Sequence, residues 1–158
     1  AKLTPSTTDV VSEARGAFLG GVDAISSSNT FPSLPLIDPE TLEFEMNVDG
    51  FVSSGGLGGP AILPLSLAKM AQLTNAFPNK SFAGIGGIAE FNHALNYFLI
   101  GCGIVQVCTA AMLDHPALFG RRFEGEVRPH RAAQPESWCG HCGSNHDPIP
   151  SRATDSAR

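Results

Sequence analysis

Residues 81–112 read "SFAGIGGIAEFNHALNYFLIGCGIVQVCTAAM" and carry the clearest indication of the fold. It contains two short apolar runs, "SFAGI" and "IVQVCTA", and Gly86-Gly87 follows the first run while Cys108-Thr109 lies near the end of the second. The second run does not alternate between apolar and polar residues, which is typical of a strand buried on both faces. We therefore expect two neighbouring strands of a parallel sheet with a helix between them.

The segment between the two runs, "AEFNHALNYFLIG" (89–101), has the residue spacing of an amphipathic helix. Gly101 closes the pattern and predicts the end of the helix. The side chains that we expect to face the core are Phe91, Ala94, Leu95, Phe98 and Leu99.

The chain before residue 81 follows the same alternation of strands and helices. Pro64 suits the first turn of a helix, because a proline there removes no helical hydrogen bond. The expected elements are a helix over 11–21 that ends at Gly20-Gly21, a strand over 22–28, a long loop from Asn29 to about Pro60, and a helix over 64–77.

This alternation predicts the α/β class. No G-x-G-x-x-G fingerprint opens a helix after an early strand, which disfavours a dinucleotide-binding fold. A piece of a (β/α)8 barrel fits better. Such barrels place their chemistry at the carboxyl ends of the strands and often bind phosphate after the last two.

Composition narrows the classes of function. The net charge of −5 argues against a nucleic-acid partner, and no apolar run reaches the roughly 18 residues of a membrane span. The first ten residues lack the apolar core of a signal peptide, and four cysteines form no disulfide framework, so we expect a cytoplasmic protein. Ala1 is an unusual natural start and suggests a processed or truncated chain.

The chain changes character near residue 120. Residues 120–158 contain six arginines, no lysine and four prolines, with no helical or strand period. We expect this tail to be disordered. Its composition would suit a segment translated from a shifted or foreign reading frame. Cys139 and Cys142 lie in it beside two histidines, but two thiolates are too few for an iron–sulfur cluster. His93 and His115 are expected to be surface histidines, and we predict no metal site.

Small residues at strand ends indicate a phosphate site. Glycines 86 and 87 leave backbone N–H groups uncovered ahead of a helix, whose N-terminus favours an anion. The alternative is a tight turn that only requires positive φ. The Thr109 hydroxyl could complete the site from the next strand.

Three further features are candidates for ligand contacts. The Asn29 amide offers both a donor and an acceptor, although Asn is also common in turns. Lys2 could stabilise an anionic ring or be an exposed terminal lysine. The cluster "SSGGLGGPA" (53–61) would let the backbone approach a flat ligand, or be a flexible loop.

Taken together, these residues resemble a known family. The segments "AKLTPSTTDV", "GGVDAISSSNT", "SSGGLGGPAILPLSLAKM", "FAGIGGI" and "GCGIVQVCTA" occur in the order and spacing of the FMN-binding barrel shared by dihydropyrimidine and dihydroorotate dehydrogenases. The resemblance implies the second half of a TIM barrel over 1–119, with its last four β/α units. "QVCTA" and "AKLTP" favour the dihydropyrimidine dehydrogenase branch, particularly the bacterial NAD-dependent catalytic subunit.

The resemblance also implies roles for individual residues. Lys2 would stabilise the reduced flavin, and Asn29 and Thr30 would contact the pyrimidine substrate and the flavin edge. Gly59 would approach the ribityl–phosphate side. The residues expected to hold the phosphate are Gly86, Gly87, Cys108 and Thr109.

Other parts of the family enzyme fall outside this sequence. The cysteine or serine that acts as acid/base belongs to the half that is absent, so the catalytic residue is unknown. NAD(P) and iron–sulfur clusters would act only through missing segments or a partner, such as an electron-transfer flavoprotein subunit. We expect an oligomer in the full-length form.

Three alternatives remain open. Dihydroorotate dehydrogenase is the same-class alternative and would need a basic residue for the substrate carboxylate. A phosphate-binding barrel with isomerase or aldolase chemistry would use no flavin. An inactive fragment is the third.

Overall fold

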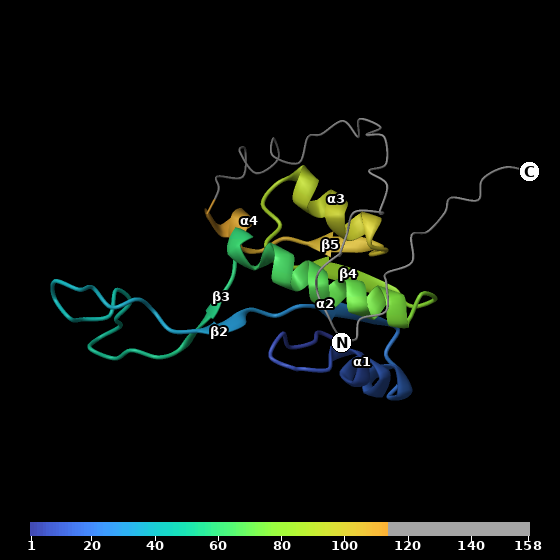
Figure 1. The fold of residues 1–158 in the computed structure, drawn as a ribbon, viewed down its shortest axis with the longest axis horizontal. Helices are drawn as coiled ribbons and strands as arrows, with labels where there is room; N and C mark the ends of the chain where they lie inside the picture. Colours follow the sequence, from blue (N-terminus) through green and yellow to red (C-terminus); the bar gives the residue numbers. More distant parts are fainter. Residues whose placement is uncertain (114–158) are drawn as a thin grey trace, which may run out of the picture. The chain divides into compact units, whose positions relative to one another are not determined.

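The computed structural model describes residues 1–113 of the chain (Figure 1). Its centre is a parallel sheet in the order β1-β4-β5, formed by β1 (Ala24–Ser27), β4 (Ser81–Ile85) and β5 (Ile104–Gln106). An isolated parallel bridge between Lys2 and Ser26 adds a fourth chain segment beside β1. Four neighbouring parallel segments are what the sequence predicts for four consecutive strands of a barrel wall.

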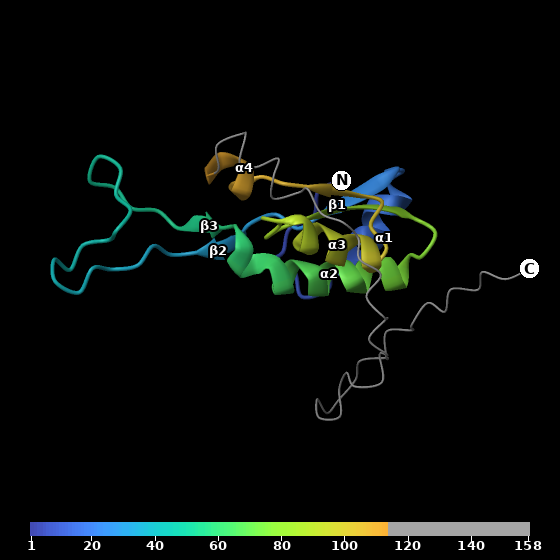
Figure 2. The ribbon, with the colours of Figure 1, turned by 90° about the horizontal axis from the view of Figure 1, so that it is seen from above.

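Three helices pack against one face of this sheet (Figure 2). They are α1 (Val10–Leu19), α2 (Leu63–Ala76) and α3 (Phe91–Leu99). Asp9 caps α1 by accepting a hydrogen bond from the Ser12 N–H at 3.0 Å. Pro64 lies in the first turn of α2, as expected from its position in the sequence.

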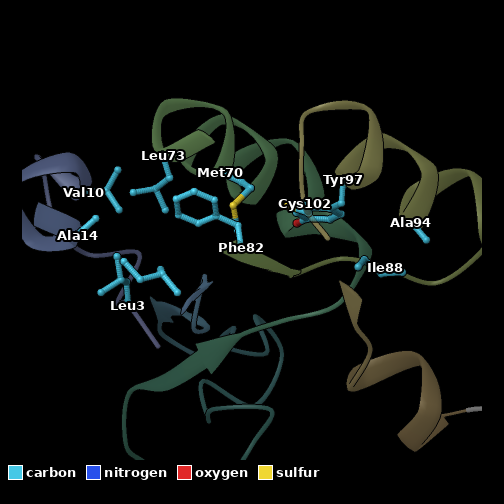
Figure 3. Close-up of a cluster of buried hydrophobic side chains, with 11 residues drawn as sticks. Leu3, Val10, Ala14, Met70, Leu73, Phe82, Ile88, Ala94, Tyr97 and Cys102 are labelled. Atoms are coloured by element: carbon cyan, nitrogen blue, oxygen red, sulfur yellow. The ribbon is translucent and has the colours of Figure 1, made fainter. Parts of the chain in front are cut away.

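The core fills the space between these helices and the sheet (Figure 3). Ile25 on β1 and Phe82 on β4 are buried in it. Burial of apolar surface such as theirs is the dominant favourable term in folding. The remaining buried members of the cluster are Leu3, Val10, Ala14, Met70, Leu73, Ile88, Ala94, Tyr97 and Cys102.

The predicted buried face of α3 is confirmed at Ala94 and wrong at its carboxyl end. Leu99 is 76% exposed and Phe98 is 44% exposed, whereas Ala94 and Tyr97 are buried. Ala94 and Tyr97 are three residues apart and share one face, which is the stripe that meets the sheet. Helix α3 also begins at Phe91 rather than Ala89, and Glu90 occupies its N-cap position without a side-chain capping hydrogen bond.

The prediction that the strand over 104–110 is buried on both faces is also wrong. Strand β5 ends at Gln106, Ile104 is 60% exposed, and α4 (Thr109–Leu113) begins soon after. The physical reason is position: β5 is the edge of the sheet, and one of its faces lacks opposing strands within residues 1–113.

The long loop expected between residues 29 and 60 contains regular structure. Strands β2 (Phe31–Ser33) and β3 (Gly55–Leu57) pair antiparallel, and a short 3-10 helix, η1 (Pro60–Ile62), follows. The residues between the two strands, 34–54, extend away from the sheet, and we call them the arm (Figure 2). It has five acidic residues and no basic one. Its large exposed apolar side chains are Leu34, Leu36, Ile37, Leu42, Met46, Val48 and Phe51.

Among the described residues, no helix has the length and apolar character needed to cross a membrane. The predictions made for 120–158, including those for Cys139 and Cys142, lie outside the described residues, as does His115.

Candidate functional site

A cavity of about 160 Å³ lies at the carboxyl ends of β1, β4 and β5. Segments that are far apart in the sequence meet there, because parallel strands end at the same edge of a sheet. All eight residues predicted as ligand contacts line this cavity: Lys2, Asn29, Thr30, Gly59, Gly86, Gly87, Cys108 and Thr109.

The Gly86-Gly87 turn forms one wall of the cavity. Both glycines have positive φ, 123° and 75°, which L side chains rarely adopt. The first turn of α2 packs directly behind them, since a Cβ on Gly87 would lie 2.6 Å from the Leu63 Cα. Neither N–H group has a hydrogen-bond partner among the described residues. The turn therefore needs glycine for its geometry and also leaves two donors at the cavity.

A second pair of glycines approaches the start of α4. Gly59 is buried with φ of 81°, and a Cβ there would lie 3.3 Å from the Thr109 Cγ2. A Cβ on Gly58 would lie 3.2 Å from the Thr109 Oγ1. These glycines bring the backbone close to the threonine, so its hydroxyl and the backbone share one small space.

Lys2, Asn29 and Thr30 form the exposed rim of the cavity. The Asn29 Oδ1 accepts a hydrogen bond from the Thr30 N–H at 2.8 Å. Part of the acceptor capacity of Asn29 is thus used within the loop, and its Nδ2 group remains as a donor. Lys2 forms the bridge beside β1 and is the cationic residue among those that line the cavity.

Two polar lining residues were missed by sequence reasoning. Gln106 accepts a hydrogen bond at its Oε1 from the Ser26 hydroxyl, at 3.0 Å, across the width of β4. The Ser28 hydroxyl pairs with that of Ser66 on α2 at 3.0 Å, and both serines are buried. Gln106 could have been predicted as a lining residue, because it is a polar residue within an otherwise apolar run. No sequence pattern indicated Ser66.

The cavity fits an anionic group better than a whole cofactor. Backbone N–H donors, a threonine hydroxyl and a lysine suit a phosphate, and the glycines leave room at the wall. The volume of 160 Å³ is about half the lower end of the range for small-molecule pockets, roughly 300 Å³. These residues therefore fit the phosphate end of a nucleotide, and a complete cofactor would need further walls.

The described part of the chain contains two cysteines and one histidine. Burial raises the pKa of the Cys102 thiol to about 11, so this cysteine is protonated and unreactive at neutral pH. Cys108 is a free, exposed thiol at the cavity. His93 accepts a hydrogen bond from the Ala89 N–H at its Nδ1 and lies 3.4 Å from Glu90, which gives it a local structural role. Within residues 1–113, no three potential metal-ligating side chains gather.

A second and larger hollow, of about 920 Å³, lies along the arm. Its lining is mainly apolar, and none of the predicted ligand contacts belongs to it. The cavity at the strand ends is therefore the candidate site.

A parallel sheet that is covered by helices on one face, with a phosphate-sized cavity at the carboxyl ends of its strands, defines one wall of a (β/α)8 barrel and its usual ligand end. A family model described as "Dihydroorotate dehydrogenase" matches residues 1–125, and the chain belongs to that family. The family is a TIM barrel of FMN-dependent dihydroorotate and dihydropyrimidine dehydrogenases. The predicted fold class, the second half of such a barrel, is confirmed.

Individual relatives carry both names. Dihydropyrimidine dehydrogenase (NADP(+)), chloroplastic, of Arabidopsis thaliana is 31% identical over 149 residues, which cover 89% of this chain and 35% of that protein. The catalytic subunit of dihydroorotate dehydrogenase B (NAD(+)) is 38% identical in Solidesulfovibrio magneticus, over 69% of this chain and 34% of that protein. In Citrifermentans bemidjiense the same subunit is 35% identical, over 88% of this chain and 44% of that protein. The chain thus spans between a third and a half of the length of these relatives.

Proposed function

We propose that residues 1–119 form the phosphate-side half of an FMN site in a dihydropyrimidine dehydrogenase, which acts on the C5=C6 bond of a pyrimidine base. The observation that carries the proposal is the convergence of eight predicted contacts on one cavity. Two glycine N–H groups in its wall have no hydrogen-bond partner within residues 1–113. The family membership supports the choice of FMN.

Each residue has a defined task in this proposal. The N–H groups of Gly86 and Gly87 and the Thr109 hydroxyl bind phosphate oxygens. Gly59 keeps the backbone close enough for the ribityl–phosphate side to pass. The preorganised donors need no rearrangement when the anion enters, which is the condition for strong binding by dipoles.

The rim residues act on the ring end of the ligand. The Lys2 ammonium favours negative charge on a bound pyrimidine-type ring. The Asn29 Nδ2 group and the Thr30 hydroxyl offer hydrogen bonds to the substrate edge. When bound, FMN supplies hydride-transfer chemistry. The acid/base side chain, NAD(P) and iron–sulfur clusters would come from other segments or from an electron-transfer subunit.

Dihydroorotate dehydrogenase is the second candidate, because the bacterial relatives at 35–38% identity bear that name. Its substrate carries a carboxylate, and among the lining residues only Lys2 is cationic. We place Lys2 at the flavin ring, so this half of the site offers no separate cation for the carboxylate. The lack of a second cation in this half of the site favours uracil or thymine over orotate as the substrate.

The experiment compares FMN with riboflavin, which differ only in the phosphate. Equilibrium dialysis of the 158-residue chain against each compound should show roughly tenfold tighter binding of FMN, since hydrogen bonds to a charged group contribute about 1.5–3 kcal/mol. Thr109→Val keeps the shape of the side chain and removes the hydroxyl, so it should reduce this preference severalfold and leave riboflavin unaffected. Equal affinity of the unaltered chain for both compounds would overturn the proposal.

A further inference from the structure

A buried phenol lies behind the Gly86-Gly87 turn. Tyr97 on α3 is fully buried among the core side chains (Figure 3). Its hydroxyl lies 2.8 Å from the Gly86 carbonyl oxygen and 3.3 Å from that of Ile85. Gly84 makes room for its ring, since a Cβ there would lie 2.3 Å from the Tyr97 Cδ1. The tyrosine is thus fixed by the strand beneath it and donates to the turn.

This hydrogen bond determines where the N–H groups of the turn point. In a trans peptide the carbonyl and the N–H that share a plane point in opposite directions. The Gly86 carbonyl faces Tyr97, so the Gly87 N–H faces away from it. The Ile85 carbonyl faces Tyr97 and the Ser28 N–H, so the Gly86 N–H is likewise directed away from them. Both glycines line the cavity.

The turn would not hold this orientation by itself. Glycine adopts several backbone conformations at little cost. A rotation of the Gly86–Gly87 peptide plane would turn the carbonyl oxygen toward the cavity, where it would repel an anion. Burial raises the pKa of the Tyr97 phenol well above its ordinary value, so the hydroxyl keeps its proton and remains a donor across the physiological range.

We propose that Tyr97 is a positioning residue for the anion site: its hydroxyl holds the Gly86-Gly87 turn with both N–H groups toward the cavity and so sets the affinity for a phosphate group. The inference rests on the proposed function, because it assigns the cause of phosphate binding at the same cavity. It adds a residue on a helix behind the turn, outside the cavity lining.

The test uses Tyr97→Phe in the full 158-residue chain, with FMN and riboflavin as probes. The phenyl ring keeps its packing against Gly84, and only the hydroxyl is lost. We expect the preference for FMN over riboflavin to fall about tenfold while riboflavin affinity stays constant. The matched control is Leu73→Val, which removes one buried methylene from α2 on the far side of the core and should leave the preference intact.

A second measurement needs no ligand. Protein labelled with 15N-glycine should show Tyr97→Phe shifts at the Gly86 and Gly87 amides and none at Gly16, Gly20 or Gly21; the retained ring keeps its own contribution to the shifts. Unmoved Gly86 and Gly87 amides, or an unchanged preference for FMN, would overturn the role of Tyr97. If the unaltered chain shows no preference for FMN, the phosphate proposal fails, and the amide shifts still decide whether Tyr97 holds the turn.

Discussion

Gly87 and Gly21 share a positive φ, 75° and 89°, but differ in what surrounds them. A Cβ on Gly87 would meet the Leu63 backbone at 2.6 Å, whereas nothing lies within 4 Å of a Cβ on Gly21. A charged residue at Gly87 would therefore disrupt packing against α2 as well as the anion site. Its effect on flavin binding would not isolate electrostatics, and Thr109 is the cleaner position for that test.

We predict that Gly87→Ala lowers the free energy of unfolding by more than about 2 kcal/mol, because steric overlap with α2 adds to backbone strain. Gly21→Ala introduces backbone strain without steric overlap, so it should lower the free energy of unfolding by about 1 kcal/mol. Urea unfolding followed by circular dichroism measures both. Equal losses in the two variants would mean that the turn does not press against α2.

Two buried titratable groups of the described residues, Cys102 and Tyr97, predict a loss of stability in alkali. Burial raises the pKa of Cys102 to about 11 from an ordinary value of 9.0. Between these values the unfolded chain releases the proton while the folded chain keeps it, so the free energy of unfolding falls as pH rises, by roughly 2–3 kcal/mol. The raised pKa of Tyr97 extends the decline above about pH 10. Urea unfolding at a series of pH values should show the fall begin near pH 9.

Cys102→Ala is the control for that prediction. It should flatten the slope between about pH 9 and 10 and leave the part due to Tyr97. A slope that is identical in the variant would show that Cys102 is not the group responsible. The chain has a single tyrosine, so absorbance of tyrosinate reports Tyr97 directly.

The sequence predicted the residues that line the cavity better than the buried residues that pack behind them. Glycines, Asn29 and Thr109 could be found because small and polar residues at strand ends are unusual against an apolar run. Tyr97 and Ser66 could not, because each lies in a helix where a polar tip on a buried side chain leaves no distinct pattern. Their contacts depend on how the helices pack on the sheet.

At the scale of elements, periodicity predicted where helices and strands lie but not which stripe faces the core. Strand β4 matches its expected range, Ser81–Ile85. In α3 two apolar stripes compete, and the one with Phe98 and Leu99 is exposed while the one with Tyr97 is buried. The surplus apolar surface of α3 and β5 would suit contact with further strands and helices of a complete ring.

The arm is separable from the fold, because none of its residues belongs to the buried core cluster. Ser33 and Gly55 pair at its base, so a two-residue Asn-Gly turn can join β2 to β3 directly. We predict that this replacement of residues 34–54 leaves the thermal unfolding midpoint within a few degrees and reduces binding of a hydrophobic fluorescent dye.

A full-length control replaces Leu36, Val48 and Phe51 with serine and keeps the arm. It should reduce dye binding to a similar degree, since all three side chains are exposed. Loss of cooperative unfolding in either protein would contradict the separation of arm and core.

At the scale of the whole molecule, the described sheet has two open edges, at the Lys2 bridge and at β5. Open edges and exposed apolar residues favour self-association. We predict that the 158-residue chain associates in solution and turns over neither dihydropyrimidines nor dihydroorotate with added FMN. Light scattering and a spectrophotometric assay test this. A monomer with turnover would show that the described wall needs no further strands.

A titration of 15N-glycine-labelled chain with FMN shows whether the strand-end cavity receives the phosphate of FMN. We predict weak binding, with shifts at the amides of Gly58, Gly59, Gly86 and Gly87 and none at Gly16, Gly20 or Gly21. Riboflavin should cause much smaller shifts. Shifts elsewhere, or no shifts at the four cavity glycines at saturating FMN, would contradict it.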